Sequence, residues 1–529
     1  MQKMPYRDHK TLTRFSSDVP TALQQLQQSQ EMQVFSRNRA EKKAEKFHPF
    51  YHYVASTGHL HDPNGLCFWQ GNWHLFYQHV YNPGTMEGRE ESTVFWGHLY
   101  SPDLIHWQEL PDAIGPGLEP QCWSGAVMIE QDRALAAYFG RDQGIYVAYS
   151  DDPLLLNWTK VSEQPVIPIE GAPCPIFDPN IFKVGDTYYI LSGRAEVDAR
   201  INHLMRQEYL FSSKDLLHWK YEHPFLKNDR FWYKDDDGAC PYFLPIGDAE
   251  DQRHLIIHFS HVAGPKWILG KFDIESMTFD AYAGGKFSSR CWKNGGIHAP
   301  SAFVNDDGEV IVIFNMNADG PAGEIPLMSL PHKLSLSGSA KDELDEDVAG
   351  DYSSLRGCYT KIEPTVLKAG QEMRFEGIGG DHVELQADIE LQRTKGVELK
   401  VFCSPDAQEY TLIRVHKNSG YINADLVNEH HELWLENTVV TIDPARASLN
   451  PNTVVRPPEV CEVPLGPKEH VKLHIFLDKG VIEVFVNQKR ALIHTAYPSR
   501  ADSTGITLTA LGADATLHSI EQWELQREE

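Results

Sequence analysis

The sequence SPDLIHW at residues 101–107 recurs, with variations, as SDDPLLLNW at residues 150–158 and SKDLLHW at residues 213–219. The tryptophans that close these stretches are Trp107, Trp158 and Trp219, which lie 51 and 61 residues apart. Around them, short apolar runs alternate with Gly, Asp, Asn and Pro, which is typical of β-strands joined by turns. A repeat of this length with about four strands is the signature of a β-propeller blade. The sequence therefore predicts an all-β fold built around a propeller.

A second repeat marks the place where each blade opens. An apolar strand follows a residue-proline step at Asp62-Pro63, Asp178-Pro179, Cys240-Pro241 and Ala299-Pro300, and Trp123-Ser124-Gly125 stands at the matching place between the first two. These openings predict five blades. Because the first strand of every blade lies beside the central channel, the side chains at the openings should converge at one end of it.

The rest of the chain divides by composition. Residues 1–47, with Gln-rich and Lys-rich stretches, predict a polar helical extension, and residues 48–337 hold the blade repeats. We expect an acidic linker at residues 338–355. Short alternating strands separated by turns then fill residues 356–529, which predicts a C-terminal β-sandwich that packs against the propeller.

The overall composition excludes several classes of partner. The formal net charge of −26 disfavours nucleic acid or an anionic membrane as a partner. The eight cysteines form no CxxC pair and no His-linked spacing, so we expect no metal site and no cofactor. No apolar run reaches membrane-spanning length, and residues 1–50 lack the apolar core of a secretory signal. We therefore expect a cytoplasmic protein with reduced thiols, and self-association of the chain stays open.

Two carboxylates stand at matched blade openings, Asp62 in HLHDPNG and Asp178 in CPIFDPNIF. One such sequence alone would indicate a turn, but the matched pair should meet in the channel. Hydrolysis of a glycosidic bond needs one carboxylate to attack or stabilise an oxocarbenium-like carbon, and another group to protonate the leaving oxygen. The pair therefore indicates a glycosidase that acts on a small carbohydrate.

Several stretches resemble motifs of glycoside hydrolase family 32, the family of sucrose, sucrose 6-phosphate and fructan hydrolases. HLHDPNGLCFWQGNWHLFYQH resembles the family's opening motif, CWSGAVMI its Trp-Ser-Gly motif, FDPNIFKVGDTYYILSG its Arg-Asp-Pro motif and GACPYFLPIG its Glu-Cys-Pro motif. FWGHLYSPDLIHW, IPLMSLPHKLSL and GVIEVFVN resemble other segments of the family. The likeness runs from about residue 48 to 525. It implies a five-bladed β-propeller followed by a C-terminal β-sandwich.

The resemblance also assigns roles to single positions. Asp62 would be the nucleophile of a retaining mechanism, and Asp178 would stabilise the transition state. The residues that would hold the furanose or line its pocket are Asn64, Gln78, Trp96, Trp123, Ser124, Phe177 and His298.

Three positions depart from the family pattern. His61 stands where Asn usually precedes the nucleophile, and Phe177 replaces the Arg of Arg-Asp-Pro, which removes a hydroxyl-binding fork. Ala239 replaces the acid/base Glu of Glu-Cys-Pro, and an alanine cannot donate a proton. The altered pocket suggests an unusual substrate.

Three functions fit this pattern of retained and replaced residues. The leading hypothesis is hydrolysis of a β-fructofuranoside or a related furanoside. The first alternative is transfer of the fructosyl group to an acceptor hydroxyl, or formation of an anhydro sugar. The second is a carbohydrate-binding protein without catalysis, which Ala239 favours and the retained Asp62 and Asp178 disfavour.

Two residues are candidates to replace the missing acid. Residues two apart in an extended strand share a face, so Asp237 should point the same way as Ala239, and Asp235 should follow if the strand continues. A bulge at Gly238 or a bridging water would bring the Asp237 carboxyl near the leaving oxygen. His298 is the alternative, since an imidazole can donate a proton near pH 7. The run at residues 235–237 also fits a solvated acidic turn.

Overall fold

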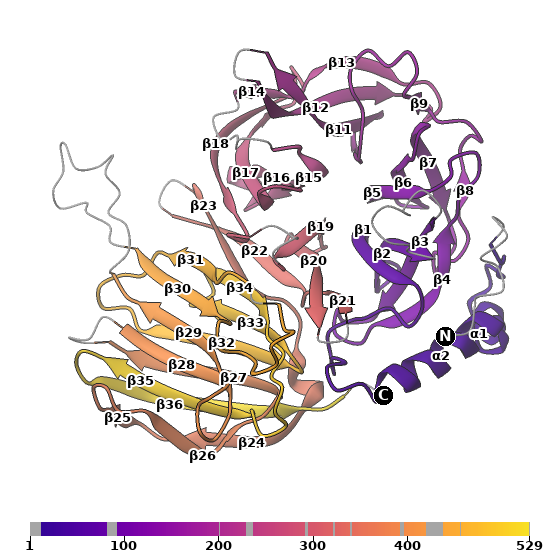
Figure 1. The fold of residues 1–529 in the computed structure, drawn as a ribbon. Coiled ribbons are helices and arrows are strands. Elements are labelled where there is room, and N and C mark those ends of the chain that lie inside the picture. The colour runs from indigo at the N-terminus through magenta and orange to yellow at the C-terminus, as the bar shows by residue number, and fades with distance from the viewer. Residues whose placement is uncertain are drawn as a thin grey trace, which may run out of the picture.

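The structure is a computed structural model that describes residues 12–81, 92–199, 202–228, 236–290, 295–320, 323–338, 341–391, 396–418, 437–454 and 456–527. Figure 1 shows two bodies, a ring of small sheets in indigo to pink and a pair of stacked sheets in orange to yellow. Among the described residues, no helix has both the length and the apolar character that a membrane crossing requires.

The described strands of the ring form the five blades that the repeats predict. The first blade contains β1 (His59–Trp69), β2 (Asn72–Tyr81), β3 (Thr93–Ser101) and β4 (Gln108–Ile114). The second contains β5 (Cys122–Ile129), β6 (Ala134–Gly140), β7 (Gly144–Ser150), β8 (Thr159–Lys160) and β9 (Ile167–Pro168). The third contains β10 (Pro179–Val184), β11 (Thr187–Asp198), β12 (His203–Ser213) and β13 (Lys220–Pro224).

The last two blades complete the ring. The fourth contains β14 (Leu226–Asn228), β15 (Ala239–Ile246), β16 (Arg253–Ser260), β17 (Gly264–Asp273) and β18 (Thr278–Lys286). The fifth contains β19 (Ile297–Val304), β20 (Val310–Gly320), β21 (Gly323–Met328), β22 (His332–Ser337) and β23 (Glu343–Val348). β23 falls inside residues 338–355, so part of the expected acidic linker is a strand of this blade, in which three acids separate the apolar Leu344 and Val348.

The repeat at residues 101–107, 150–158 and 213–219 begins with Ser-x-Asp. This Ser-x-Asp repeat forms the turn between the third and fourth strands of the first three blades. In each copy an Asp carboxylate accepts hydrogen bonds from backbone N–H groups two or more residues ahead; these residues are Asp103, Asp152 and Asp215. A leucine in each turn adopts the left-handed backbone conformation; these are Leu104, Leu155 and Leu216, with φ of 71°, 50° and 67°. The repeat therefore recurs because each blade needs the same turn.

The first strands of the five blades line the central channel. β1 contacts β5 and β19, β10 contacts β5 and β15, and β15 contacts β19, so the ring of inner strands is closed. Four of them carry a register shift near the blade opening, at Leu60/Pro63 in β1, Cys122/Gly125 in β5, Ala239/Tyr242 in β15 and Ile297/Pro300 in β19. A bulge bends the strand and re-aims its side chains. These bulges therefore turn side chains at the blade openings toward one another.

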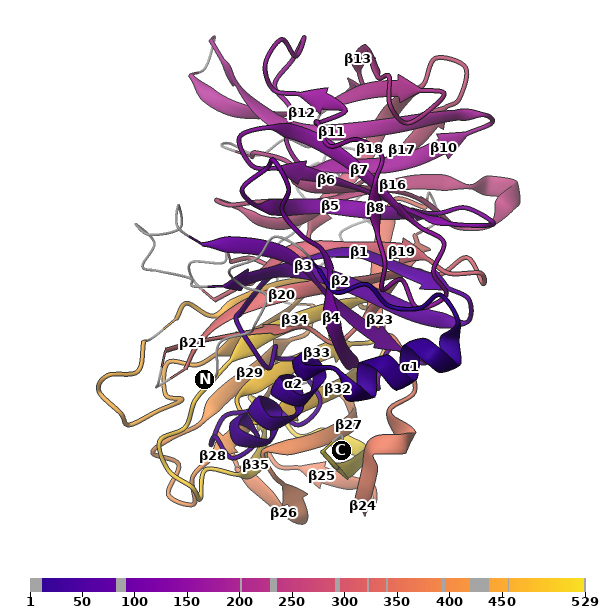
Figure 2. The ribbon, with the colours of Figure 1, turned by 90° about the vertical axis from the view of Figure 1, so that its right-hand side faces the viewer.

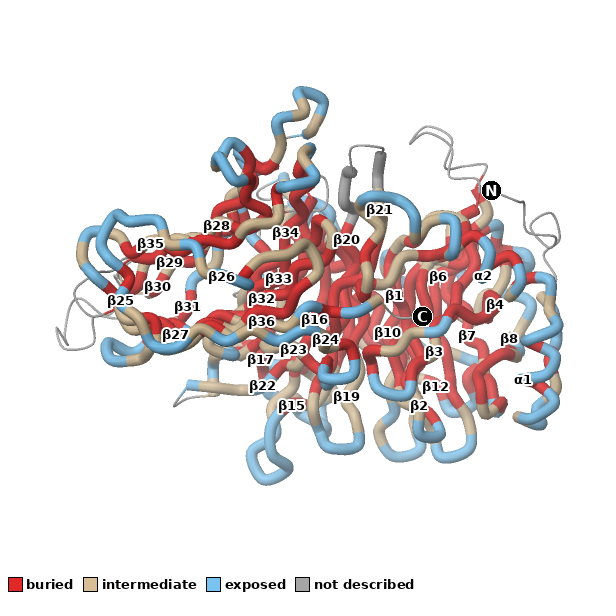
Figure 3. Tube along the Cα trace, turned by 90° about the horizontal axis from the view of Figure 1, so that it is seen from below, coloured by how far each residue is buried: buried red, intermediate tan, exposed pale blue. Residues whose placement is uncertain are grey.

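The second body is a β-sandwich of two sheets whose facing sides form one apolar core. One sheet contains β24 (Arg356–Ile362), β25 (Thr365–Leu367), β27 (His382–Glu390), β32 (Val471–Asp478), β33 (Val481–Val486), β34 (Arg490–Thr495) and β36 (Ala515–Leu525). The other contains β26 (Met373–Gly379), β28 (Gly396–Cys403), β29 (Thr411–His416), β30 (Thr438–Asp443), β31 (Glu459–Val463) and β35 (Gly505–Leu511). In Figure 3 the buried residues follow the strands of both bodies and the exposed ones gather at the turns.

The N-terminal extension forms two helices, α1 (Val19–Gln28) and α2 (Gln30–Lys42), which lie along the first blade near β4 (Figure 2). Ser29 separates them because its side chain accepts a hydrogen bond from the N–H of Met32 and so caps α2. Val34 and Phe35 of α2 pack against side chains of the first blade. The polar helix expected from the sequence is thus present as a pair that is docked on the propeller.

Candidate active site

Asp62 lies on β1 beside the bulge, and its side chain is 9% exposed. Its Oδ2 accepts hydrogen bonds from Ser124 Oγ at 2.8 Å and from Gln78 Nε2 at 3.2 Å. His61 Nδ1 and His298 Nε2 lie 2.8 and 3.3 Å from its Oδ1. Burial alone would raise the pKa of Asp62, but His61 and His298 outweigh it and hold this pKa well below its usual range. Asp62 is therefore an ionised carboxylate.

Asp178 approaches Asp62 from the opening of the third blade, with Cys240 between them. The Cys240 Sγ lies 3.4 Å from Asp178 Oδ2 and 3.9 Å from Asp62 Oδ2, so the carboxylates can be no farther apart than these two distances together. Burial, together with the charge of Asp62, raises the pKa of Asp178 to about 7. The structure thus brings the matched pair together and shifts the pKa values of its two members in opposite directions.

Cys240 is a site residue to which sequence reasoning gave no role. Its backbone N–H donates a hydrogen bond to Asp178 Oδ2 at 3.1 Å. Its φ of 49° lies in the left-handed region, which is strained for a residue other than glycine. Its position in a Cys-Pro blade opening was the signal that could have identified it.

Three of the predicted sugar-binding residues support Asp62 and the strands beside it. Gln78 Nε2 donates to Ser124 Oγ at 2.6 Å, which closes a triangle with Asp62. Asn64 is fully buried, and its Oδ1 accepts a hydrogen bond of 3.4 Å from the N–H of Gly125. These contacts join β1, β2 and β5 at the opening of the channel.

Aromatic rings form one wall beside Asp178. Phe177 packs edge-on against Trp123, with ring centroids 5.9 Å apart, and the Arg194 guanidinium lies 5.0 Å from the Phe177 ring centre. Trp96, which was predicted to hold the sugar, is instead fully buried. Its Nε1–H donates to the Trp123 carbonyl oxygen at 2.8 Å, so Trp96 positions Trp123 from the core side of the blade.

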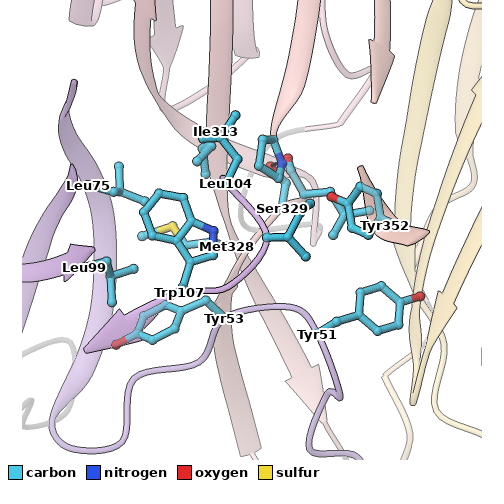
Figure 4. Close-up of a pocket in the computed structure, with 13 residues that line it drawn as sticks. Tyr51, Tyr53, Leu75, Leu99, Leu104, Trp107, Ile313, Met328, Ser329 and Tyr352 are labelled. Atoms are coloured by element: carbon cyan, nitrogen blue, oxygen red, sulfur yellow. Dashed lines mark hydrogen bonds between the residues drawn. The ribbon is translucent and has the colours of Figure 1, made fainter. Parts of the chain in front are cut away.

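A cavity at the seam between the first blade, the fifth blade and the sandwich is too small for a sugar. Figure 4 shows mainly apolar side chains around it, among them Leu75, Trp107 and Met328. Its accessible volume is about 10 Å³, which is roughly the space of one water molecule. The candidate active site is instead the channel opening, where the two buried carboxylates of Asp62 and Asp178 meet.

Two protein-family models match the chain, one for each body. The model of the "Glycosyl hydrolases family 32 N-terminal domain" matches residues 52–346, and that of the "Glycosyl hydrolases family 32 C terminal" matches residues 351–524. The chain belongs to glycosyl hydrolase family 32. The predicted family, the glycosidase class and the propeller-plus-sandwich fold are confirmed.

Relatives within family 32 are similar over nearly the whole chain. A sucrose-6-phosphate hydrolase of Zymomonas mobilis is 26% identical over 92% of this chain and 95% of its own length. A levanase of Bacillus subtilis is 22% identical over 90% of this chain and 70% of its own length. The crystal structure of fructan 1-exohydrolase IIa from Cichorium intybus has a TM-score of 0.76, with 19% identity over 92% of this chain and 98% of that chain.

At the position of the family 32 acid/base, the structure has an apolar patch. Ala239 is 1% exposed and packs with Cys240, Phe259, Ala299 and Phe177. The methyl side chain of Ala239 has no proton to give to a leaving oxygen. A proton donor in this protein would need to come from another position.

Asp237 does not share a strand face with Ala239, so the predicted orientation of its side chain is wrong. β15 begins only at Ala239, and Gly238 has a φ of 60°, which turns the chain before the strand. The carboxylate of Asp237 instead accepts a hydrogen bond of 3.0 Å from the backbone N–H of His261 and lies 2.5 Å from His261 Nδ1. Asp235 lies outside the described residues.

His298 lies in the channel but is poorly suited to donate a proton to a leaving group. It is 2% exposed, and burial lowers its pKa to about 4 despite the nearby charge of Asp62. At neutral pH its imidazole is uncharged, and its Nε2 faces Asp62. It is placed to orient the carboxylate.

Among the described residues, two groups hold three donor atoms close enough for one metal ion, and both are explained by contacts between histidines and carboxylates. In the channel these are His61, Asp62 and His298, and on the sandwich Glu390, His470 and His518. The 2.8 Å between His61 Nδ1 and Asp62 Oδ1 is shorter than the roughly 3.3 Å that separates two ligands of a tetrahedral zinc. On the sandwich, His470 pairs with Asp388 and His518 with Glu390. We assign neither group as a metal site.

Proposed function

We propose that this family 32 enzyme hydrolyses the glycosidic bond of a β-fructofuranoside by a retaining, two-step mechanism with Asp62 as nucleophile. The observation that carries the proposal is the state of Asp62, a buried carboxylate that is held ionised at the mouth of the channel and oriented through both oxygens. A carboxylate in this state needs no activating base to attack a sugar carbon.

The surrounding side chains supply the other requirements of the first step. Ser124 and Gln78 fix the Asp62 carboxylate, so it meets the anomeric carbon of the furanose in one orientation. Asp178, with its pKa near 7, can donate or accept a hydrogen bond with a furanose hydroxyl as positive charge develops on the ring. Water then cleaves the Asp62 ester and releases the free sugar.

The printed names of the relatives support the substrate class. They refer to sucrose 6-phosphate in the Zymomonas mobilis enzyme, to levan in the Bacillus subtilis enzyme and to fructan in the Cichorium intybus enzyme. In this chain Phe177 stands on the pocket wall with the cation of Arg194 over its ring. The preferred fructoside is therefore expected to place an apolar or anionic group against that wall.

Product analysis tests the proposal. The protein is incubated with sucrose, sucrose 6-phosphate, inulin oligosaccharides and levan oligosaccharides, and the products are followed by NMR. Hydrolysis with retention gives free fructose that first appears as the β anomer. New oligosaccharides or an anhydro sugar would instead establish transfer, and saturable binding without turnover would establish a binding protein.

A further inference from the structure

The strand that pairs with Ala239 shows where another proton donor could lie. Ala239 on β15 pairs with Phe259 on β16. Two residues beyond Phe259, His261 lies beside it, with ring centroids 4.6 Å apart. His261 thus stands at the open edge of the apolar patch that Ala239 leaves.

His261 also faces the reacting groups and solvent at the same time. Its ring centre is 5.8 Å from that of His298, whose Nε2 is 3.3 Å from Asp62 Oδ1. Its side chain is 50% exposed, in contrast to the 2% of His298. The leaving part of a sugar must pass between the nucleophile and solvent, and His261 lies at this border.

The charges around His261 favour its protonated form. Asp237 lies against Nδ1, and Asp62 and Asp178 add negative charge from β1 and from the opening of the third blade, while His298 approaches from β19. Burial would lower the pKa of His261, but Asp237 and the two channel carboxylates outweigh it and raise this pKa above its usual value. Because Asp237 accepts from Nδ1, the proton on Nε2 is the one left to give.

We propose that His261 is the acid/base of this enzyme and that Asp237 is its positioning residue; the proposal rests on the fructosidase function proposed above. In the first step Asp62 bonds to the anomeric carbon, the bond from that carbon to the leaving oxygen breaks, and this oxygen takes the proton from His261 Nε2. In the second step the neutral imidazole takes a proton from water as the water oxygen displaces Asp62. The second step restores the starting proton on His261 and the free Asp62 carboxylate.

The test compares two leaving groups in the variants His261→Gln and Asp237→Asn. The glucose part of sucrose leaves as an alkoxide unless its oxygen is protonated, whereas the nitrophenol of a nitrophenyl β-fructofuranoside leaves as a stable phenolate. We expect His261→Gln to slow cleavage of sucrose by about 10²- to 10⁴-fold, to slow the first step with the nitrophenyl substrate far less, and to remove the basic limb of the pH profile of kcat/KM. Asp237→Asn should shift that limb to lower pH.

A second Asp–His pair in the chain provides the matched control. His218 lies 2.8 Å from Asp215 in the turn between β12 and β13, with an 87% exposed side chain, so His218→Gln removes a similar contact outside the channel. It should keep the parent rate, and thermal unfolding of all three variants should stay close to the parent. Equal losses on both substrates, or an unchanged basic limb in His261→Gln, would overturn the assignment of His261 while leaving the fructosidase intact. A parent protein that cleaves neither substrate would overturn both proposals.

Discussion

The Asp62 carboxylate is held by side chains on β2, β5 and β19. A substitution can therefore remove its charge and keep the position of the side chain. Asp62→Asn keeps the shape of the side chain but removes the nucleophile. We expect kcat to fall by roughly 10³-fold or more, as for other residues that form the covalent intermediate. Steady-state kinetics on the best fructoside of the panel measures this, with the thermal unfolding midpoint as a check on the fold. Turnover at the parent rate would remove Asp62 from the proposed role.

Asp178 should make stability depend on pH in an unusual direction. Its pKa rises from the usual 3.8 to about 7 because of burial and the charge of Asp62. The stability associated with an acid of raised pKa is fully present below pH 3.8 and is lost as the pH rises through about 7. We expect Asp178→Asn to raise the free energy of unfolding at pH 8 by up to about 4 kcal/mol, and the gain to shrink at pH 5. Denaturant titrations at both values measure it; a gain that does not change with pH would contradict the assigned pKa.

Some residues of the site could be predicted from the sequence and others could not. Asp62 and Asp178 could be paired from the sequence because both stand at blade openings, and the openings meet in the ring. His261 could not be found, because its place beside Ala239 depends on the register between β15 and β16. Trp96 was assigned to the pocket by resemblance, which carries residue type but not burial.

At the scale of the elements, local turn chemistry could be predicted and strand irregularity could not. The Ser-x-Asp turns repeat because an Asp side chain satisfies nearby N–H groups whatever the surroundings, so they mark the first three blades from the sequence alone. The bulges at the openings depend on pairing with a second strand, and the start of β15 at Ala239 depends on the turn at Gly238. Errors such as the predicted orientation of Asp237 arise at these irregular positions.

The bulge in β5 should tolerate no side chain at Gly125. A Cβ there would lie 2.0 Å from the Ala137 carbonyl oxygen and 2.6 Å from the Tyr138 Cα, both on the neighbouring strand. We expect Gly125→Ala to cost about 1–3 kcal/mol or more of stability. It should also reduce kcat, because Ser124 would move away from Asp62. Thermal unfolding and kinetics measure the two effects.

Gly466 provides a control for this substitution. A Cβ at Gly466 has its nearest neighbours at 3.7 and 3.9 Å, both on the side chain of Glu469. Gly466→Ala should therefore leave stability and kcat near the parent values. If Gly125→Ala behaved in the same way, the packing of β5 against β6 would not be what positions Ser124.

At the scale of the whole molecule, a buried ionic network joins the segment before the propeller, the fifth blade and the sandwich. His52 lies 2.8 Å from Asp478 and 3.2 Å from Glu483, and His332 lies 3.1 Å from Glu483 and 2.6 Å from Glu346. Asp478 and Glu483 belong to the sandwich strands β32 and β33. Every side chain of this network is at least nine-tenths buried, so buried ionic contacts join the propeller to the sandwich.

The pKa values of the network define the pH range in which it stabilises the fold. Burial would lower the pKa of His52 and of His332, but hydrogen bonds to Asp478, Glu346 and Glu483 raise both to about 9. Stability from such histidines is complete below their usual pKa of about 6.5 and is lost as the pH rises through about 9. Burial would raise the pKa of Glu483, but His332 and His52 lower it to about 2, so its contribution is lost only as the pH falls through about 2.

Removal of the shared carboxylate should therefore loosen the docking of the two bodies. We expect Glu483→Gln to cost about 3–5 kcal/mol near pH 6, because it leaves two buried imidazoles without their common partner. It should also flatten the fall in the unfolding midpoint between pH 7 and 9.5, since each histidine then keeps one carboxylate partner instead of two and its pKa is raised less. Glu524→Gln is the control, because Glu524 pairs with His382 at 3.1 Å with half of its own side chain exposed. A variant that lost no more stability than this control, or kept the parent's alkaline slope, would show that the network does not hold the sandwich to the propeller.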